Sequence, residues 1–392
     1  MGNMEQVEEL TTLIGDLVRI ETENPPGNEK ACTEYIASWF EERGIEANVI
    51  DEPHPDRPQI GVKIGSGEPT LVLNGHIDVV PAGDRDQWTH DPYAGDEVDG
   101  CLYGRGSVDM KTGVAIGMLT VAHLADDLKS GEIPGSLVFH AAIGEETAEP
   151  GTKTLLETGY DGDYGVVLEP TRLHTATSEK GLAWYEIVVT GDPSHASRPD
   201  QGTNAIQFAK PLLDALDEYD TDVRERSDSL VGQAYSTVTM FEAGTKENVV
   251  PEKAKITIDR RFLPDESIEQ IDSEIDTLVG TVEEEHGVSI SWNRTRTYES
   301  AAIAEDSILA EVFRKHSARV ADVSPEPWGV NASTDVRNFI NDANMEAITW
   351  GPGDLAQAHT YDEHVELSSA ADGLTALLGA AEEILSETHM TE

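Results

Sequence analysis

The sequence has few cysteines and few cations, and each shortage excludes a class of protein. Its 392 residues include two cysteines, Cys32 and Cys101, too few for a disulfide framework or for a zinc site built from thiolates. Lys and Arg together number 27 against 75 Asp and Glu, so the formal net charge is −48 at pH 7. Binding to nucleic acid or to an anionic membrane needs clustered cations, and we therefore expect neither as a partner.

Long hydrophobic runs are also missing. No apolar stretch approaches the roughly 20 residues that a membrane-spanning helix needs. Glu5, Glu8 and Glu9 stand near the N-terminus, where a signal peptide would carry basic residues. We therefore predict a cytoplasmic protein. The acidic residues are spread along the chain, which predicts a halophilic source, because about 1 M salt reduces the Debye length to roughly 3 Å and screens their mutual repulsion.

The first part of the chain has the pattern of an α/β domain. Helices are expected over residues 4–20, 29–43 and 111–128, and short buried strands over 71–73, 136–139 and 166–168. Strands that alternate with helices favour a doubly wound layer around a mixed sheet. A helix over 306–319, a strand over 346–350 and a helix over 368–386 resume this style near the C-terminus.

A different pattern interrupts it. From about residue 180 the expected elements are strand 182–190, helix 203–219, strands 234–242 and 254–262, helix 266–285 and strand 288–293. This is the β-α-β-β-α-β order of a ferredoxin-like α+β fold. We therefore predict one catalytic domain, residues 1–179 and 294–392, with an inserted domain of residues 180–293.

A histidine and an aspartate follow the first predicted strand. If that strand continues past residue 73, His76 and Asp78 share a face, and the carboxylate can receive the second imidazole N–H of a metal-bound histidine. A histidine with a chance acidic neighbour is the alternative, and taken alone it is the more common case in a chain so rich in Asp.

Three more acids lie beside predicted strands or helices. Asp109 stands in a glycine-rich turn before the helix at 111–128, where a helix cap is the more common role for a lone Asp. Glu145 and Glu146 differ from the Glu pairs on solvated helices because they follow a buried strand and Gly144. Two acids in one pocket can divide their work, one binding metal and the other moving protons.

Glu169, at the end of the strand at 166–168, could supply another oxygen, and His359 a second histidine. The candidate ligands are then His76, Asp109, Glu146, Glu169 and His359. Five such donors are too many for one open tetrahedral zinc but suffice for two metals that share a carboxylate. No single residue is decisive, and the set as a whole predicts a di-metal hydrolase.

Several short motifs occur in order along the chain: GHIDVVP (75–81), GRGSVDMK (104–111), GEE (144–146), EP (169–170), GPGD (351–354) and AHT (358–360). With them the sequence resembles the di-zinc deacylase and exopeptidase family of acetylornithine deacetylase, succinyl-diaminopimelate desuccinylase, aminoacylase-1 and the glutamate carboxypeptidases. The resemblance implies that Asp109 bridges two Zn²⁺ ions per subunit. It places His76 and Glu169 on one ion, and Glu146 and His359 on the other. Co²⁺ or Mn²⁺ would also suit these ligands.

The resemblance also implies roles in catalysis. Asp78 would orient His76, and Glu145 would be the general base. The insert would be a lid and dimerisation domain, and the loop around His195 resembles the one whose histidine reaches the active site of the partner subunit. A homodimer is therefore expected, although His195 by itself is no more than a loop histidine.

Four further residues match positions that bind substrate in the family: Asn248, Arg261, Ser333 and Thr334. Asn248 and Arg261 would hold the carboxylate end of the substrate, and Ser333 and Thr334 would add a polar contact. Without the resemblance, Arg261 is better read as a surface arginine on a strand.

The implied reaction is metal-dependent hydrolysis of the amide bond of N-acyl amino acids, of the acetylornithine deacetylase or succinyl-diaminopimelate desuccinylase type. A di- or aminopeptidase with the same centre is the alternative, because the shape of the pocket selects the substrate and the metal motif does not. An inactive metal-binding or interaction protein is a remote alternative, against which Asp78 and Glu145 argue. The acyl group, the amino acid and the pathway do not follow from the sequence.

Overall fold

The computed structural model describes residues 2–147 and 149–386, and the chain divides into two compact units. The first unit lies within residues 1–177, 303–329 and 334–392, and the second comprises residues 178–302 and 330–333. The predicted insert, 180–293, falls inside the second unit. That unit extends further because its last long strand, β14 (Ser289–Tyr298), continues past residue 293.

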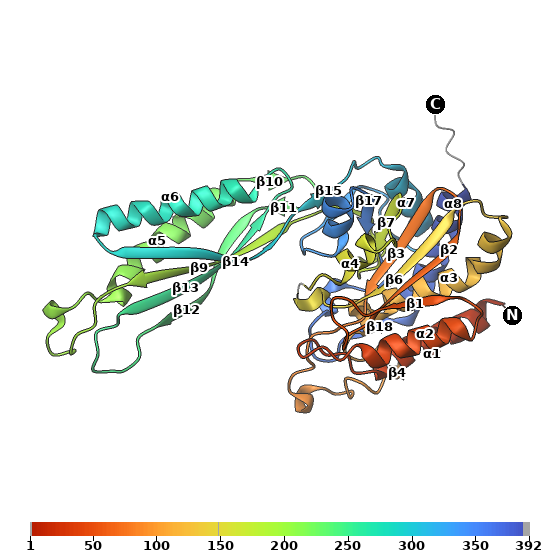
Figure 1. The fold of residues 1–392 in the computed structure, drawn as a ribbon, viewed down its shortest axis with the longest axis horizontal. Helices are drawn as coiled ribbons and strands as arrows, with labels where there is room; N and C mark the ends of the chain where they lie inside the picture. The colour runs from red at the N-terminus through yellow and green to blue at the C-terminus, as the bar shows by residue number, and fades with distance from the viewer. Residues whose placement is uncertain (1, 148, 387–392) are drawn as a thin grey trace. The chain divides into compact units, whose positions relative to one another are not determined.

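A mixed sheet forms the centre of the first unit (Figure 1). Its strands are ordered β1 (Ala47–Ile50), β2 (Gln59–Gly65), β6 (Ser136–Ala142), β3 (Thr70–His76), β7 (Tyr164–Val167), β17 (Glu346–Thr349) and β8 (Ala176–Glu179). The four strands β6, β3, β7 and β17 run parallel, whereas β1, β2 and β8 pair antiparallel. The predicted α/β fold with a mixed sheet is thus confirmed.

Helices and strands of the first unit enclose a large apolar core. The helices are α1 (Gly2–Arg19), α2 (Lys30–Glu41), α3 (Thr112–Ser130), α4 (Gly151–Glu157), α7 (Ile308–Val320) and α8 (Leu367–Ser386). Neighbouring residues of β6 show the two faces of the sheet. Phe139 packs against Phe40 of α2, whereas His140 stacks on Phe339 on the other face. This alternation is the two-residue period of a strand buried on both sides.

Short strands complete the first unit and mark the crossings between the units. A small antiparallel sheet contains β4 (Asp96–Val98), β5 (Cys101–Tyr103) and β18 (His364–Glu366). The chain passes between the units in β8, after β15 (Ala301–Ala302), in β16 (Trp328–Val330) and between residues 333 and 334. The sequence interpretation did not include β1 or β2. In β2 the exposed Lys63 interrupts the apolar run that would have marked it as a strand.

The second unit has the predicted order of elements. They are β9 (Gly181–Thr190), α5 (Ala205–Val223), β12 (Tyr235–Ala243), β13 (Lys253–Phe262), α6 (Ile268–His286) and β14, with a small hairpin of β10 (Ser227–Asp228) and β11 (Gly232–Gln233). The antiparallel sheet is ordered β12-β13-β9-β14, which is the ferredoxin-like arrangement. Figure 1 shows α5 and α6 on the same face of this sheet, where they enclose a second core.

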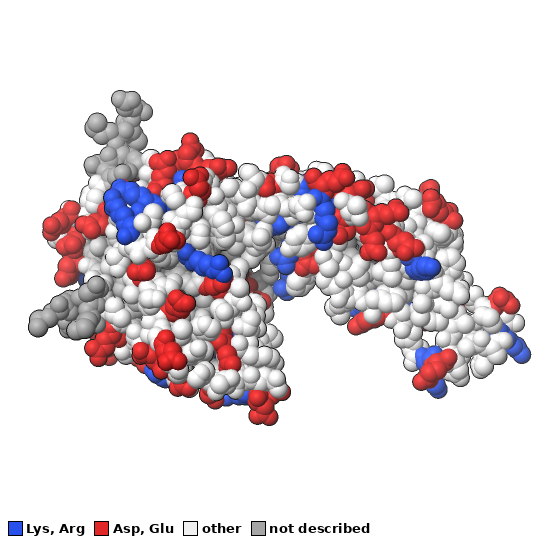
Figure 2. All heavy atoms as spheres, turned by 180° about the vertical axis from the view of Figure 1, so that it is seen from behind, with Lys and Arg blue, Asp and Glu red and all other residues white. Residues whose placement is uncertain are grey.

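The surface is as acidic as the composition requires. Figure 2 shows Asp and Glu over both units of the face in view, with fewer Lys and Arg between them. Among the described residues, no helix combines the length and the apolar character needed to cross a membrane.

Candidate metal centre

The five predicted ligands come from segments that follow the parallel strands or lie next to them. His76 ends β3, Glu146 follows β6, and Glu169 follows β7. Because these three strands are adjacent and parallel, their carboxyl ends lie at one edge of the sheet, which is where α/β proteins bind ligands. Asp109 lies in the irregular turn η2 (Ser107–Lys111) before α3, and His359 in the loop after η6 (Leu355–Gln357).

A glycine brings the turn of Asp109 close to the end of β7. Gly113 is in the first turn of α3, and a Cβ atom there would lie 2.1 Å from the main-chain oxygen of Leu168. Any larger residue would therefore push the start of α3 away from the strand that carries Glu169. The helix and the strand end can approach closely only because residue 113 has no side chain.

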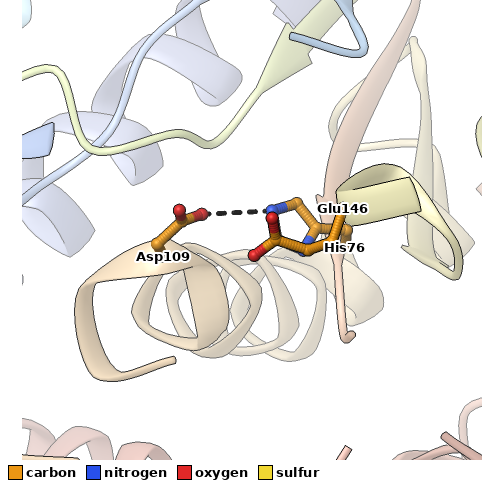
Figure 3. Close-up of side chains that lie close together, drawn as sticks. All are labelled: His76, Asp109 and Glu146. Atoms are coloured by element: carbon orange, nitrogen blue, oxygen red, sulfur yellow. Dashed lines mark hydrogen bonds and ion pairs between the residues drawn. The ribbon is translucent and has the colours of Figure 1, made fainter. Parts of the chain in front are cut away.

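The side chains of all five ligands converge. Asp109 contacts a histidine with each of its carboxylate oxygens: Oδ1 lies 3.2 Å from His76 Nε2, and Oδ2 lies 3.3 Å from His359 Nε2. Glu169 Oε1 is 3.5 Å from His76 Nε2, and Glu146 Oε2 is 3.1 Å from His359 Nε2. Figure 3 shows the ligand atoms of His76, Asp109 and Glu146 side by side. Asp109 thus lies between the two histidines, and each histidine also contacts one glutamate.

The two histidines sit in different surroundings. The His76 side chain is 2% exposed, whereas that of His359 is 52% exposed, so the centre opens toward solvent on the His359 side. His359 also has a left-handed backbone conformation, with φ of 61°. A non-glycine residue held in that region costs on the order of 1 kcal/mol, and such residues are concentrated at functional sites.

The pKa shifts of the side chains in the cluster indicate that a positive charge would stabilise it. Burial, together with the neighbouring charge of Asp109, raises the pKa of Glu169 to about 7. Hydrogen bonds that His359 donates to the carboxylates of Asp109 and Glu146 raise its pKa to about 10. Burial by itself disfavours the cation of His76, yet contacts with Asp109 and Glu169 raise its pKa well above the usual value. The three neighbouring carboxylates thus favour the protonated form of both imidazoles. Carboxylates and imidazoles arranged in this way are ligands suited to divalent cations.

Asp78 lies beside His76, and its main-chain oxygen is closer to the imidazole than its carboxylate is. The strand ends at His76, and the Nδ1 atom of His76 lies 2.9 Å from the main-chain oxygen of Asp78. The Asp78 carboxylate is 3.7 Å from the same nitrogen. The imidazole is therefore oriented by a backbone carbonyl, which leaves Nε2 as the ligand atom.

Glu145 lies beside the ligands in the short turn η3 (Glu145–Thr147). Burial raises the pKa of its carboxyl group well above the usual value, and the charges of Asp335, Glu169 and Glu146 add to this effect, which His76 opposes. A carboxyl group that takes up a proton easily, next to a cation centre, has the property that a proton-transfer residue needs.

Of the remaining predicted residues, all but Thr334 lie in the second unit. His195 and Asn248 lie in the second unit, in loops that pair with each other, since His195 bridges to Val249 and Ala196 N donates to Asn248 O. In the same unit, Arg261 forms a two-pronged ion pair with Asp259, at 2.7 and 3.1 Å.

Ser333 and Thr334 have different surroundings despite their adjacency. Thr334 is buried, and its hydroxyl lies 3.1 Å from that of Thr349. The hydroxyl of Ser333 is enclosed and has no hydrogen-bond partner among the described residues.

Sequence reasoning missed three residues that support the centre. Glu363 accepts hydrogen bonds from the backbone N–H groups of Val108 and Asp109, and pairs with the buried Arg105. Asn24 donates to the carboxylate of Asp78. Nothing in the sequence separates Glu363 from the other acids, because its partners are more than 250 positions away.

An α/β fold with two histidines and three carboxylates at the carboxyl edge of its parallel strands defines the class of hydrolases with a dinuclear metal centre. Residues 72–383 match the model of peptidase family M20/M25/M40, and the chain belongs to that family. Membership confirms the predicted relationship and the predicted class: the protein is a metal-dependent amide hydrolase.

Curated relatives resemble the chain over nearly its whole length. A probable succinyl-diaminopimelate desuccinylase of Staphylococcus aureus (strain N315) is 29% identical, with 92% of this chain and 93% of the relative covered. An N-formyl-4-amino-5-aminomethyl-2-methylpyrimidine deformylase of Bacillus subtilis (strain 168) is 26% identical, with 94% and 92% covered.

Solved structures share the fold. A tripeptidase of Staphylococcus aureus has a TM-score of 0.76 at 19% identity, with 97% of this chain and 99% of the other covered. A dinuclear metal-binding M20 peptidase of Bacillus subtilis has a TM-score of 0.72 at 17% identity, with 97% and 98% covered.

Proposed function

We propose that the protein hydrolyses the amide bond of N-acyl amino acids with the help of two divalent cations, zinc first among them. The observation that carries the proposal is the position of Asp109, whose two carboxylate oxygens each contact one histidine. Imidazole and carboxylate ligands suit Zn²⁺, and they also accept Co²⁺ or Mn²⁺. His76 and Glu169 hold one cation, and Glu146 and His359 hold the other.

The cations supply Lewis-acid polarisation of the scissile carbonyl and lower the pKa of the attacking water to about 7. The chain supplies the proton transfer. Glu145 takes a proton from that water and returns it to the leaving amine, a contribution of about 10²- to 10⁴-fold. Its buried position, which raises the pKa of its carboxyl group, favours keeping the proton between the two steps.

The second unit contributes to substrate binding in this proposal. Arg261 presents a planar fork whose Nε and Nη2 atoms face Asp259, which leaves the N–H groups of Nη1 for a substrate carboxylate. Asn248 and Ser333 add polar contacts to the substrate, and Thr334 follows Ser333 in the chain, with its hydroxyl 3.1 Å from that of Thr349. His195 stabilises the oxyanion, worth about 2.7–4 kcal/mol by analogy with one oxyanion-hole donor.

A peptidase is the second candidate, and the structural likeness to a tripeptidase favours it. A panel of N-succinyl-diaminopimelate, N-acetylornithine and simple dipeptides, assayed for released amine alongside metal analysis, distinguishes the two. We expect release from an N-acyl amino acid by protein that binds two metal ions per chain. Release from the dipeptides alone would support the peptidase. No release from any of these compounds by metal-loaded protein would refute the deacylase proposal.

We further infer that the enzyme is a homodimer in a salt-rich cytoplasm. The dimer is supported by the family resemblance of the loop that carries His195, an exposed residue. The salt-rich setting is supported by the net charge of −48 and by the acidic surface in Figure 2. Light scattering at high and low KCl tests the first inference, and a monomer at both concentrations would contradict it.

A further inference from the structure

The carboxylate of Asp78 is fully buried and is surrounded by N–H groups. Its Oδ1 atom accepts from the backbone N–H groups of Gly144, at 2.9 Å, and Glu145, at 3.3 Å. Its Oδ2 atom accepts from the backbone N–H of Glu146, at 3.2 Å, and from Asn24 Nδ2, at 3.0 Å. Four donors thus converge on one side chain, and three of them belong to the turn of the proposed base and a proposed ligand.

The shape of that turn explains why its three N–H groups point the same way. Gly144 has φ of 81°, in the left-handed region that favours glycine, and a Cβ atom there would lie 2.5 Å from Glu149 Cβ. Successive N–H groups around such a residue form a concave anion site. In this protein the anion is the carboxylate of Asp78, about 66 residues earlier in the chain.

The backbone of Asp78 lies closer to the neighbouring histidine than its carboxylate does. The main-chain oxygen of Asp78 lies 2.9 Å from His76 Nδ1, whereas the carboxylate is 3.7 Å away. Residue 78 therefore hydrogen-bonds to the imidazole through its backbone oxygen and to the turn through its side chain.

We propose that Asp78 is a positioning residue for the turn of Glu145 and Glu146, and that Asn24 is a second one. Asn24 is 3% exposed, and its Nδ2 atom also lies 2.7 Å from Thr147 Oγ1, so it joins the carboxylate to the far end of the same turn. The loop of Asn24 is itself fixed, since Asn24 N donates to Val79 O and Val79 N to Thr22 O. The inference rests on the proposed function for the roles of Glu145 and Glu146.

The test uses a substitution that changes the acceptor and little else. In Asp78→Asn one of the two carboxylate oxygens is replaced by an NH₂ group, which cannot accept a hydrogen bond. Whichever way the amide is oriented, this NH₂ group faces N–H donors that bound the carboxylate, and these donors lose their acceptor. The backbone oxygen that orients His76 is unchanged. Asn24→Ala removes one donor of the four and provides a milder variant if Asp78→Asn does not fold.

Thr22→Val is the matched control. Thr22 is as buried as Asp78, and its hydroxyl donates to Ile77 O, at 2.6 Å, in the same loop without touching the turn. Hydrogen–deuterium exchange of the metal-free proteins is the first measurement. We expect exchange at residues 144–146 to be at least about tenfold faster in Asp78→Asn, moderately faster in Asn24→Ala, and unchanged in Thr22→Val. Unchanged exchange at 144–146 in both test variants would overturn the proposal.

Metal titration against a chelator dye is the second measurement. Glu146→Gln and Glu169→Gln identify which binding step belongs to which site. We expect Asp78→Asn to weaken the same step as Glu146→Gln, by about tenfold or more. Weakening of the Glu169→Gln step instead would mean that Asp78 acts through His76, and the proposal would be wrong. Neither measurement uses turnover, so an inactive protein would refute the proposed function and leave this test intact.

Discussion

Replacing Glu363 by glutamine should destabilise the protein by about 3–5 kcal/mol. The Glu363 side chain is fully buried, Arg105 is 3% exposed, and Arg105 Nη1 lies 2.5 Å from Glu363 Oε2. The guanidinium also lies 5.1 Å above the ring of Trp88, so no water replaces the lost carboxylate easily. In Glu363→Gln a neutral amide faces the guanidinium, and an arginine without its counter-charge stays buried, which is the cause of the large cost.

Burial raises the pKa of Glu363 to about 7, so the measurement is urea unfolding of metal-free protein at fixed salt and about pH 9, where Glu363 is ionised, extrapolated linearly to water. The exposed pair Arg85–Glu21 provides the control, and Glu21→Gln should cost less than about 1 kcal/mol. The double variant Arg105→Met with Glu363→Gln removes the buried cation as well and should recover at least half of the loss. A cost for Glu363→Gln no larger than that of Glu21→Gln would refute the reasoning.

Three further outcomes are expected. Glu145→Ala should abolish turnover and keep its metal, whereas Glu146→Ala should lose metal; a Glu145→Ala enzyme with a near-normal rate in the amine-release assay would contradict the assignment of the base. Burial lowers the pKa of His140 to about 4. On acidification this histidine therefore binds a proton in the unfolded chain at a higher pH than in the folded protein, and the free energy of unfolding should fall as the pH drops below about 6.5. In urea unfolding, the free energy of unfolding of the wild type should fall by about 2 kcal/mol more than that of His140→Gln between pH 7.5 and pH 5. If the free energies of the two proteins changed in parallel with pH, a neutral buried His140 would be contradicted. Thermal stability and activity should both rise with KCl, and a maximum in dilute buffer would exclude the salt-adapted interpretation.

The sequence by itself indicated four of the five candidate ligands through the local patterns around them. His76 and Glu169 follow short apolar runs that are strands β3 and β7, and Asp109 and Glu146 follow glycine-containing turns. Parallel strands bring their carboxyl ends to one edge, so a local pattern was enough to predict a shared site. The order of elements in the second unit was likewise predictable, because its apolar residues alternate between the spacing of strands and the spacing of helices.

Only the tertiary structure decided what supports that site. The carboxylate of Asp78 accepts hydrogen bonds from Asn24, 54 positions away, and from Gly144, 66 positions away, while Glu363 reaches Val108 across 255 positions. A buried carboxylate takes whichever donors the folded chain brings to it, and in a sequence with 75 acids no local pattern separates such a residue from one on the surface. The residue types and their order determined the chemistry of the site, whereas the hydrogen bonds that orient its side chains depend on long-range packing.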